Sequence, residues 1–523
     1  MNITNVTDNI YVCFKFFMMK FINKLDTGLW LLLLLWCFSI MFWIEADSYT
    51  HDLFTRGDTA WFMGAGRAVA KGLVPYVDFS DSKGLLLWWI YALGYWINDY
   101  TYIGVFWISV MFSWGTFIYS YKTAMLLSEN NRTLSLLATL LMSFPFYNSL
   151  IHGRLMEFRC EDFCLLFISW GVYYLINEVK KRESSISFKP GFMLGVGLVA
   201  CIMIKWSIGV MYLAIVGAYC YLLIKHKSFK GLIGGLFGVF MSSIPFIIAF
   251  IYYGNLGPFI QEYFLNTSKT VSQPLGAMLC AYLTEELKRL FTSQSIISLF
   301  WIISALIYAH KHKHCLIPVL SGLFILLLAA KHDLGYYTIV IAPYAIFVCV
   351  AIASWIKNHC NVVLKYPFLF GLVWWLFNTI PNFIRNEGMW YNSDRELFYK
   401  TSYMIGQIKN VRIINESTVG DPVGSIPGSK YWLAQFGETP EMRNLRNRDI
   451  HDGNADVIFG NVDALVNKKI FQKYTICDDK GKSISFWGRK GLKYPPKDFY
   501  VSDMDILLKK RVINIEKQKY NEL

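Results

Sequence analysis

The residues best suited to chemistry lie in three short polar segments between long apolar runs. The first segment contains Asp58, then the turn Pro75-Tyr76, and then Asp81-Ser82-Lys83. A carboxylate can act as a general base or bind a cation, and a lysine can bind a phosphate. The alternative is structural, because Asp58 precedes a predicted helix that it could cap while the other charges face solvent.

The second segment, 151–162, is crowded with ionisable side chains and ends with Glu161 and Asp162 at the predicted start of a helix. Two roles stay open for these carboxylates. They could bind a polar substrate, or they could stabilise the helix, since negative charge is favoured at a helix N-terminus.

The third segment reads Lys331-His332-Asp333-Leu-Gly-Tyr336-Tyr337 and lies between two apolar runs. Ammonium, imidazolium and phenol groups are hydrogen-bond donors that suit a phosphate at a membrane surface. Lys331 could instead extend its side chain to the lipid headgroups. Lys205 also interrupts an apolar run, and it either faces the interior of a helix bundle or reaches the membrane surface from a helix end.

The composition shows which elements must position these residues. Hydrophobic residues make up 55% of the 523 and charged residues only 17%, against about 25% in soluble domains. A membrane-spanning helix needs about 20 apolar residues. Candidate helices lie at 28–44, 84–98, 101–121, 133–150, 163–178, 191–204, 206–224, 231–252, 294–309, 315–330, 334–355 and 366–381.

Basic residues in short loops favour the cytoplasm, and this rule selects one topology. If 84–98 stays at the outer surface, the basic clusters near 15–24, 122–132, 180–189, 225–230, 311–313 and 357–365 all lie inside. A helix over 84–98 would also be only about 22 Å long, short of the ~30 Å hydrocarbon core. We therefore predict eleven crossings, with 45–83, 151–162, 253–293 and 331–333 outside.

The last 142 residues differ from the rest of the chain. Residues 382–523 contain 41 charged residues, against 46 in the preceding 381. Alternating apolar residues at 455–459 and 483–487 indicate short strands. We predict an α-helical polytopic membrane domain over 1–381 and a small extracytoplasmic α/β domain over 382–523.

The net charge of +13 does not indicate nucleic-acid binding, because most of the excess lies in loops that orient a membrane protein. The eleven cysteines lie mostly within apolar runs and have no zinc-ligand spacing.

The first outer segment resembles that of the GT-C superfamily of membrane glycosyltransferases, which includes protein O-mannosyltransferases and the lipid A aminoarabinose transferase. The matching elements are Asp58, Gly72-Leu-Val-Pro75-Tyr76, Asp78 and Asp81-Ser-Lys83, with Gly84-Leu85 where the family has Pro-Pro. Glu161 resembles the acid of the family's second outer loop. Lys331-His332 and Tyr336 resemble its late basic-aromatic motif.

The resemblance implies an inverting glycosyltransferase that moves a sugar from a polyprenyl-phosphate donor to an acceptor hydroxyl on the outer face of the cell membrane, in cell-envelope glycan or glycolipid synthesis. Asp58 would be the general base. Asp81, Lys83, Glu161, Asp162, Lys331, His332 and Tyr336 would bind substrate. No cofactor is required, a divalent cation stays an open alternative, and the acceptor could be a lipid, a glycan or a protein.

Two alternatives from other classes remain. A lipid-linked glycan flippase or transporter would place charges near the membrane midplane and show repeat symmetry. A non-catalytic polysaccharide assembly protein would tolerate the loss of Asp58.

Overall fold

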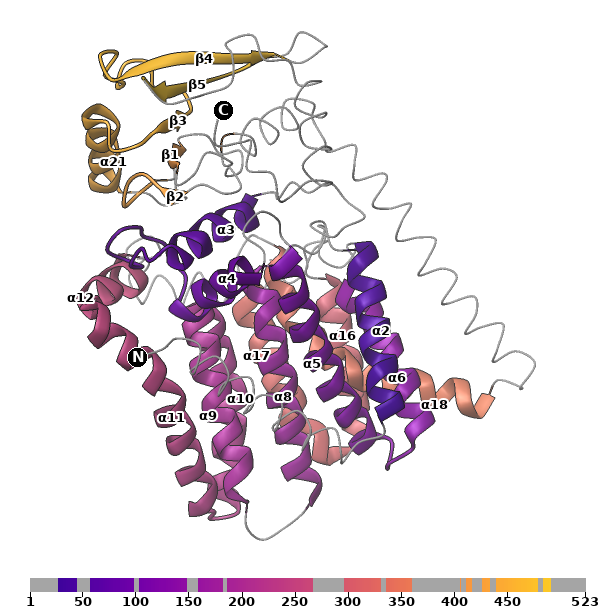
Figure 1. Cartoon of the computed structure of the whole chain (residues 1–523). Coiled ribbons are helices and arrows are strands. Elements are labelled where there is room, and N and C mark those ends of the chain that lie inside the picture. The colour runs from indigo at the N-terminus through magenta and orange to yellow at the C-terminus, as the bar shows by residue number, and fades with distance from the viewer. Residues whose placement is uncertain are drawn as a thin grey trace.

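The computed structural model describes a bundle of long helices with a small sheet beyond one end of the bundle (Figure 1). The described residues are 27–44, 57–97, 103–147, 159–181, 186–266, 296–330, 335–359, 405, 411–415, 426–432, 439–477 and 483–490. The predicted helix 366–381 lies outside these residues.

The helical part alternates long apolar helices with short turns. Its helices are α2 (Thr27–Ile44), α3 (Gly57–Ala70), α4 (Leu85–Ile97), α5 (Ile103–Leu127), α6 (Arg132–Tyr147), α8 (Cys160–Lys181), α9 (Phe188–Ile204), α10 (Trp206–Lys225), α11 (Phe229–Tyr253), α12 (Leu256–Phe259), the π-helix η1 (Ile260–Asn266), α16 (Ile296–Lys311), the 3-10 turn η3 (Lys313–Cys315), α17 (Leu316–Ala330), the 3-10 helix η4 (Gly335–Tyr344) and α18 (Ala345–His359).

Within the described residues, five segments are long and apolar enough to cross a membrane. They are Ile103–Leu127, Cys160–Lys181, Trp206–Lys225, Phe229–Tyr253 and Tyr337–Asn358. Shorter apolar helices lie at Gly28–Phe42, Leu85–Ile97, Arg132–Met142, Phe188–Ile204 and Lys313–Ala329. The chain therefore has the character of a helical membrane protein, while the count of eleven crossings stays a prediction.

The basic turns gather at the bundle end farther from the sheet (Figure 1). Lys180 donates to the carbonyl of Leu126, and Tyr308 donates to the carbonyl of Leu127 at 3.5 Å. Ser228 donates to the carbonyl of Ile186 at 2.8 Å. The turns after α5, α8, α10 and α16 thus share one end, as the charge pattern predicted.

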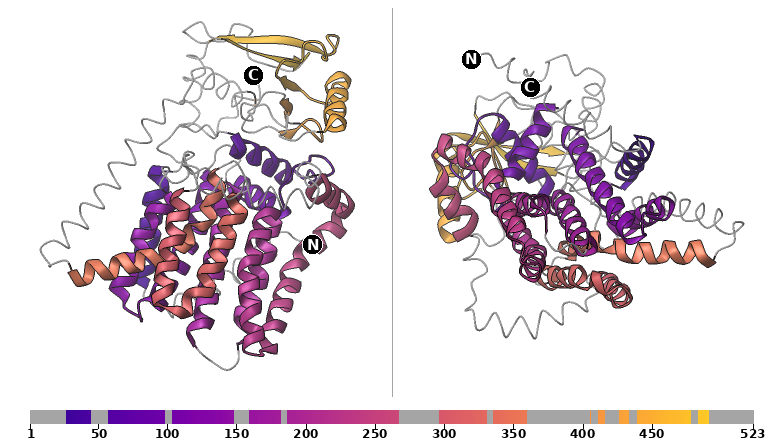
Figure 2. Two further views of the ribbon diagram at one scale, coloured as in Figure 1. Left: turned by 180° about the vertical axis from the view of Figure 1, so that it is seen from behind. Right: turned by 90° about the horizontal axis from the view of Figure 1, so that it is seen from below.

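Helices α3 and α4 lie across the other end of the bundle, beneath the sheet (Figures 1 and 2). Helix α4 covers most of the segment 84–98, which we predicted to stay at one membrane surface. Its residues Trp88, Tyr91 and Tyr95 are buried, whereas Trp96 is 72% exposed.

Helices α9 and α11 pack through glycines with their backbones almost touching. A Cβ atom at Gly191 would lie 2.1 Å from the carbonyl oxygen of Gly231, and one at Gly238 would lie 2.1 Å from that of Phe192. Such small residues permit close approach of helices in an apolar environment, where packing rather than the hydrophobic effect drives association.

The C-terminal sheet has the strand order β2-β1-β3-β5-β4. Its strands are β1 (Arg412–Asn415), β2 (Ile426–Pro427), β3 (Val457–Phe459), β4 (Phe471–Cys477) and β5 (Ser483–Arg489). Strand β1 pairs in parallel with β2 and β3, whereas β5 pairs antiparallel with β3 and β4. Strands β3 and β5 coincide with the two predicted stretches, and helix α21 (Pro440–Asp452) completes a small α/β unit.

Candidate active site at the sheet end of the bundle

The loop between α3 and α4 carries Asp81 and Lys83 and is fixed by the turn at Pro75-Tyr76. Tyr76 is fully buried and has a φ of 69°, an uncommon conformation for a residue other than glycine. Its backbone N–H donates to the carbonyl of Phe79 at 2.6 Å, and its phenol donates to the carbonyl of Lys83 at 2.8 Å. The turn therefore sets the position of Lys83 directly.

Asp81 and Lys83 form an ion pair in which the carboxylate is buried. The Lys83 Nζ lies 3.5 Å from Asp81 Oδ1, and their side chains are 14% and 1% exposed respectively. The ammonium also lies 5.4 Å from the centre of the Phe62 ring, where a cation–π attraction holds it. Asp81 is therefore not a charge that faces solvent, while substrate binding by Asp81 and Lys83 stays a prediction.

Gly84 brings this loop against the end of helix α9. Its N–H donates to the carbonyl of Ile204 at 3.0 Å, and a Cβ atom at this position would lie 2.0 Å from the carbonyl oxygen of Met203. A larger residue would push the two segments apart. Lys83 directly precedes Gly84, and Lys205 directly follows Ile204. The hydrogen bond between Gly84 and Ile204 therefore joins the two segments that carry these lysines.

Glu161 of α8, Lys205 between α9 and α10, and Tyr337 of η4 form a second buried polar cluster. The Lys205 Nζ donates to Glu161 Oε1 at 2.5 Å and to the Tyr337 hydroxyl at 2.6 Å. Lys205 is the single extended residue between α9 and α10, with φ −153° and ψ 114°. This break turns its side chain into the bundle, so the bundle-interior alternative for Lys205 is the one observed.

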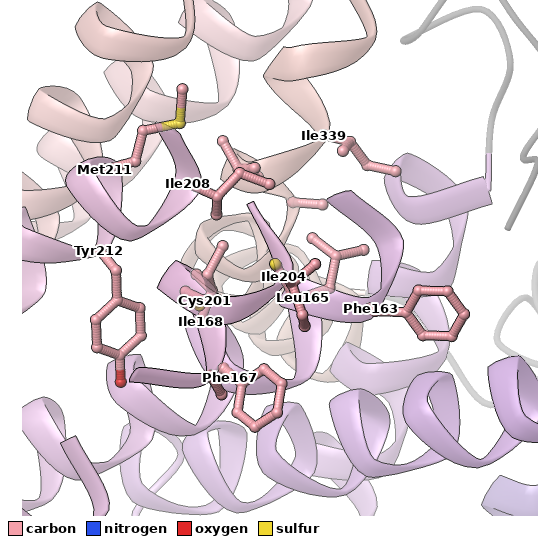
Figure 3. Packing of buried hydrophobic residues seen from close by; sticks show 14 of the residues in the cluster. Phe163, Leu165, Phe167, Ile168, Cys201, Ile204, Ile208, Met211, Tyr212 and Ile339 are labelled. Carbon is pink, nitrogen blue, oxygen red and sulfur yellow. The ribbon is translucent and has the colours of Figure 1, made fainter. Parts of the chain in front are cut away.

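The ion pair lies beside a densely packed apolar core. Phe163, Ile204 and Ile208 are completely buried, and they belong to the same apolar cluster as Cys201 and Ile339 (Figure 3). A buried ion pair loses much of its hydration, and removing one partner typically costs about 3–5 kcal/mol. Ionisable residues within apolar helices commonly mark functional sites.

Asp162 has the structural role that the sequence left open, at the N-terminus of a helix. Its carboxylate accepts a hydrogen bond from the N–H of Arg159 at 3.2 Å. Arg159 immediately precedes α8 and Asp162 is the third residue of that helix, so the carboxylate makes one of the two hydrogen bonds of a capping box, the one to the N-cap N–H. Any contribution of Asp162 to substrate binding stays a prediction.

The remaining predicted site residues have side chains outside the described part of the structure. Asp58 is the second residue of α3, so it lies within the first turn of the helix and not before it, and its side chain lies outside the described part. Tyr336 belongs to η4 and its side chain also lies outside, as do Lys331 and His332 altogether. Among the predicted residues, Asp81 pairs with Lys83, and Glu161 pairs with Lys205, whose segment is hydrogen-bonded to that of Lys83 through Gly84 and Ile204.

A third polar cluster, centred on Glu262 of η1, had no counterpart in the sequence predictions. Glu262 Oε2 accepts from Ser80 Oγ and from Asn266 Nδ2, both at 2.9 Å. Its Oε1 lies 2.7 Å from Lys430 Nζ and accepts from the Tyr431 hydroxyl at 2.8 Å. No spacing pattern indicated this cluster, since its members are separated by 182 and 169 positions in the chain.

Burial alone would raise the pKa of Glu262, but hydrogen bonds from Lys430, Tyr431 and Ser80 outweigh it and lower the pKa below its ordinary value. Burial and the neighbouring carboxylate raise the pKa of Tyr431, so its phenol stays protonated and donates. Glu262 is therefore a charged acceptor at neutral pH.

Among the residues that the structure describes, no group of three or more His, Cys, Asp or Glu side chains could bind a metal ion. No protein-family model matches this chain, and no curated protein matches it in sequence.

Proposed function

We propose that this chain is an inverting membrane glycosyltransferase of the GT-C type, with eleven membrane crossings and its active site on the extracytoplasmic face. The donor is a polyprenyl-phosphate sugar and the acceptor is a hydroxyl group of a lipid, glycan or protein. The resemblance of the first loop, with Asp58, Pro75-Tyr76 and Asp81-Ser-Lys83, motivates this assignment.

The observation that carries the proposal is that two buried ion pairs lie on chain segments joined by a backbone hydrogen bond at one end of an apolar bundle. The Gly84–Ile204 hydrogen bond links the segment of Asp81 and Lys83 to that of Lys205, which pairs with Glu161. This end lies opposite the basic turns, and the positive-inside rule assigns those turns to the cytoplasm. Nucleotide sugars are largely cytosolic, so a lipid-linked donor suits the other face.

In the proposed reaction, the acceptor oxygen attacks the anomeric carbon as the bond from that carbon to the phosphate oxygen breaks. Asp58 accepts the hydroxyl proton, and polyprenyl phosphate leaves with the bonding electron pair. Lys83 stabilises the charge that develops on the phosphate, together with Lys331, His332 and Tyr336. Glu161, held by Lys205, orients the sugar or the acceptor. The proposal requires no cofactor.

A transfer assay tests this function. Purified protein is given polyprenyl phosphates carrying a radiolabelled hexose or pentose, with a cell-envelope extract as acceptor. We expect label to move from the lipid phosphate to an acceptor, and Asp58→Asn to lower the rate by about 10²–10⁴-fold. Wild-type rates in Asp58→Asn would eliminate the proposed base.

Asp78→Asn is the matched control from the same loop. Asp78 accepts the backbone N–H of Val74 at 2.6 Å, so its carboxylate closes a turn. We expect this variant to keep most of the activity. Movement of the intact donor across a vesicle membrane, without cleavage of the sugar–phosphate bond, would instead indicate a flippase.

A further inference from the structure

The junction between the C-terminal sheet and the helical part is built around the loop that carries Asp81 and Lys83. The N–H of Ser80 donates to the carbonyl of Lys430 at 2.8 Å, while the Ser80 hydroxyl donates to Glu262. Ser80 is thereby held from two sides, once by the C-terminal unit and once by η1. Asp81 follows it directly in the chain.

Neighbouring contacts hold the same junction. Asn255 donates from Nδ2 to the carbonyl of Pro75 at 3.0 Å, at the turn that leads into the loop. Trp432 is completely buried and packs on α3, where a Cβ atom at Gly64 would lie 2.5 Å from its ring. Arg446 of α21, which is also buried, donates to the carbonyl of Tyr431 at 3.3 Å.

We propose that Glu262 is a positioning residue that locks the C-terminal unit, through Lys430 and Tyr431, onto the Asp81–Lys83 loop. Glu262 accepts hydrogen bonds from the loop and from the C-terminal unit with different carboxylate oxygens, so a single side chain aligns the two. The C-terminal unit is then part of the active-site framework. The proposal concerning catalysis rests on the proposed function, whereas the contact between the two parts does not.

Hydrogen–deuterium exchange of the full-length protein in detergent tests the lock without any substrate. The variants are Glu262→Gln, which removes the charge, and Tyr431→Phe, which removes one donor and keeps the ring. We expect exchange to rise about tenfold or more in peptides covering 76–84 and 426–432, because bonds to a charged group are lost. Peptides from α9 and α11 should keep wild-type rates.

Lys473→Ala is the control variant. It removes an exposed ion pair with Asp463, at 2.8 Å, within the C-terminal sheet. We expect no change in exchange over 76–84. Unchanged exchange over 76–84 in both Glu262→Gln and Tyr431→Phe would overturn the proposal. Faster hydrogen–deuterium exchange in all peptides of Glu262→Gln, with wild-type exchange in Tyr431→Phe, would also overturn the proposal. Such a result would reflect general unfolding of the Glu262→Gln variant.

The transfer assay extends the test to catalysis. We expect Tyr431→Phe and Glu262→Gln to lower kcat while leaving KM for the polyprenyl-phosphate sugar within about twofold, since the lock aligns the loop for reaction. A wild-type enzyme without transfer activity would refute the proposed function but leave the exchange result standing. An active wild type whose variants keep kcat would refute the positioning role.

Discussion

At the scale of single residues, the central feature is a lysine buried at a break between two helices. Lys205 pairs with Glu161 and Tyr337, and the three residues come from segments far apart in the chain. A pair of this kind is weak evidence for stability, because two well-packed apolar residues can replace a buried ion pair at little cost. Stability alone therefore does not account for the pair, and we propose that it serves the site.

The first prediction separates that role from stability. Lys205→Met leaves Glu161 charged and buried, so we expect it to lower the unfolding free energy by about 3–5 kcal/mol. The double variant Lys205→Met/Glu161→Met removes both charges and should recover most of that stability. Thermal unfolding in detergent measures both effects.

In the transfer assay, the same double variant should be inactive although it is stable, because it lacks the Glu161 carboxylate that orients a substrate. A stable double variant with wild-type transfer would show that the pair is structural only. Lys205→Arg is the conservative control that keeps the charge.

At the scale of elements, a seam of glycines packs α9, the helix that leads to Lys205, against α11. Helix α9 cannot carry a side chain at Gly191, nor α11 at Gly238, without moving, because each Cβ atom would lie 2.1 Å from a carbonyl oxygen of the other helix. Since α9 ends at Lys205, a displaced α9 would also displace the ion pair.

The second prediction concerns this seam. Gly191→Ala should destabilise the protein by about 1–3 kcal/mol through overpacking, although alanine has the better helix propensity. Gly217→Ala in α10 is the matched control, because a Cβ atom there would have no atom of another segment within 4 Å. It should be neutral or slightly stabilising. Equal unfolding temperatures for the two variants would contradict close packing at the seam.

Much of the arrangement of elements could be predicted from the sequence, because apolar runs and basic loops report directly on membrane-like helices. The grouping of the basic turns and the position of α4 across the bundle end follow from those two patterns. Long-range contacts do not leave such a pattern. The partner of Lys205 and the role of Glu262 depend on side chains that only the fold brings together.

Gly84 is a second example of a long-range contact that the sequence pattern did not predict. Its place where the resembling family has Pro-Pro looked like a departure from the motif. The structure explains it by the approach of the Met203 carbonyl, which no other residue type would allow without movement.

At the scale of the whole molecule, the bundle has one end with basic turns and one end with the buried clusters and the sheet (Figure 1). The third prediction is that these ends face different compartments. Lys225→Cys and Lys473→Cys each add an exposed thiol, at the basic end and in the sheet respectively. Intact cells are treated with a membrane-impermeant maleimide, and labelling is compared with that of the wild type.

We expect additional labelling of Lys473→Cys in intact cells and of Lys225→Cys only after permeabilisation. The reverse pattern would contradict the orientation on which the lipid-linked donor depends.

The fourth prediction is a pH dependence of the junction. The lowered pKa of Glu262 means that its ionised form stabilises the folded protein. This contribution is complete above about pH 4.3, the ordinary glutamate pKa, and is lost as the pH falls through the lower folded value. Tyr431, which faces the carboxylate, has a raised pKa and keeps its proton throughout this range.

The difference in unfolding temperature between wild type and Glu262→Gln, measured from pH 7 downwards, should therefore be largest at neutral pH and shrink under acidic conditions. A constant difference across this range would show that the carboxylate charge does not hold the junction.

The most direct measurement is a structure of the Asp58→Asn variant with a bound polyprenyl-phosphate sugar. We predict that the phosphate lies beside Lys83 at the sheet end and that the sugar lies between position 58 and Glu161. The anomeric carbon should face an acceptor hydroxyl that is within hydrogen-bond reach of position 58. A donor bound among the basic turns, or one at the sheet end whose sugar faces away from position 58, would contradict this prediction.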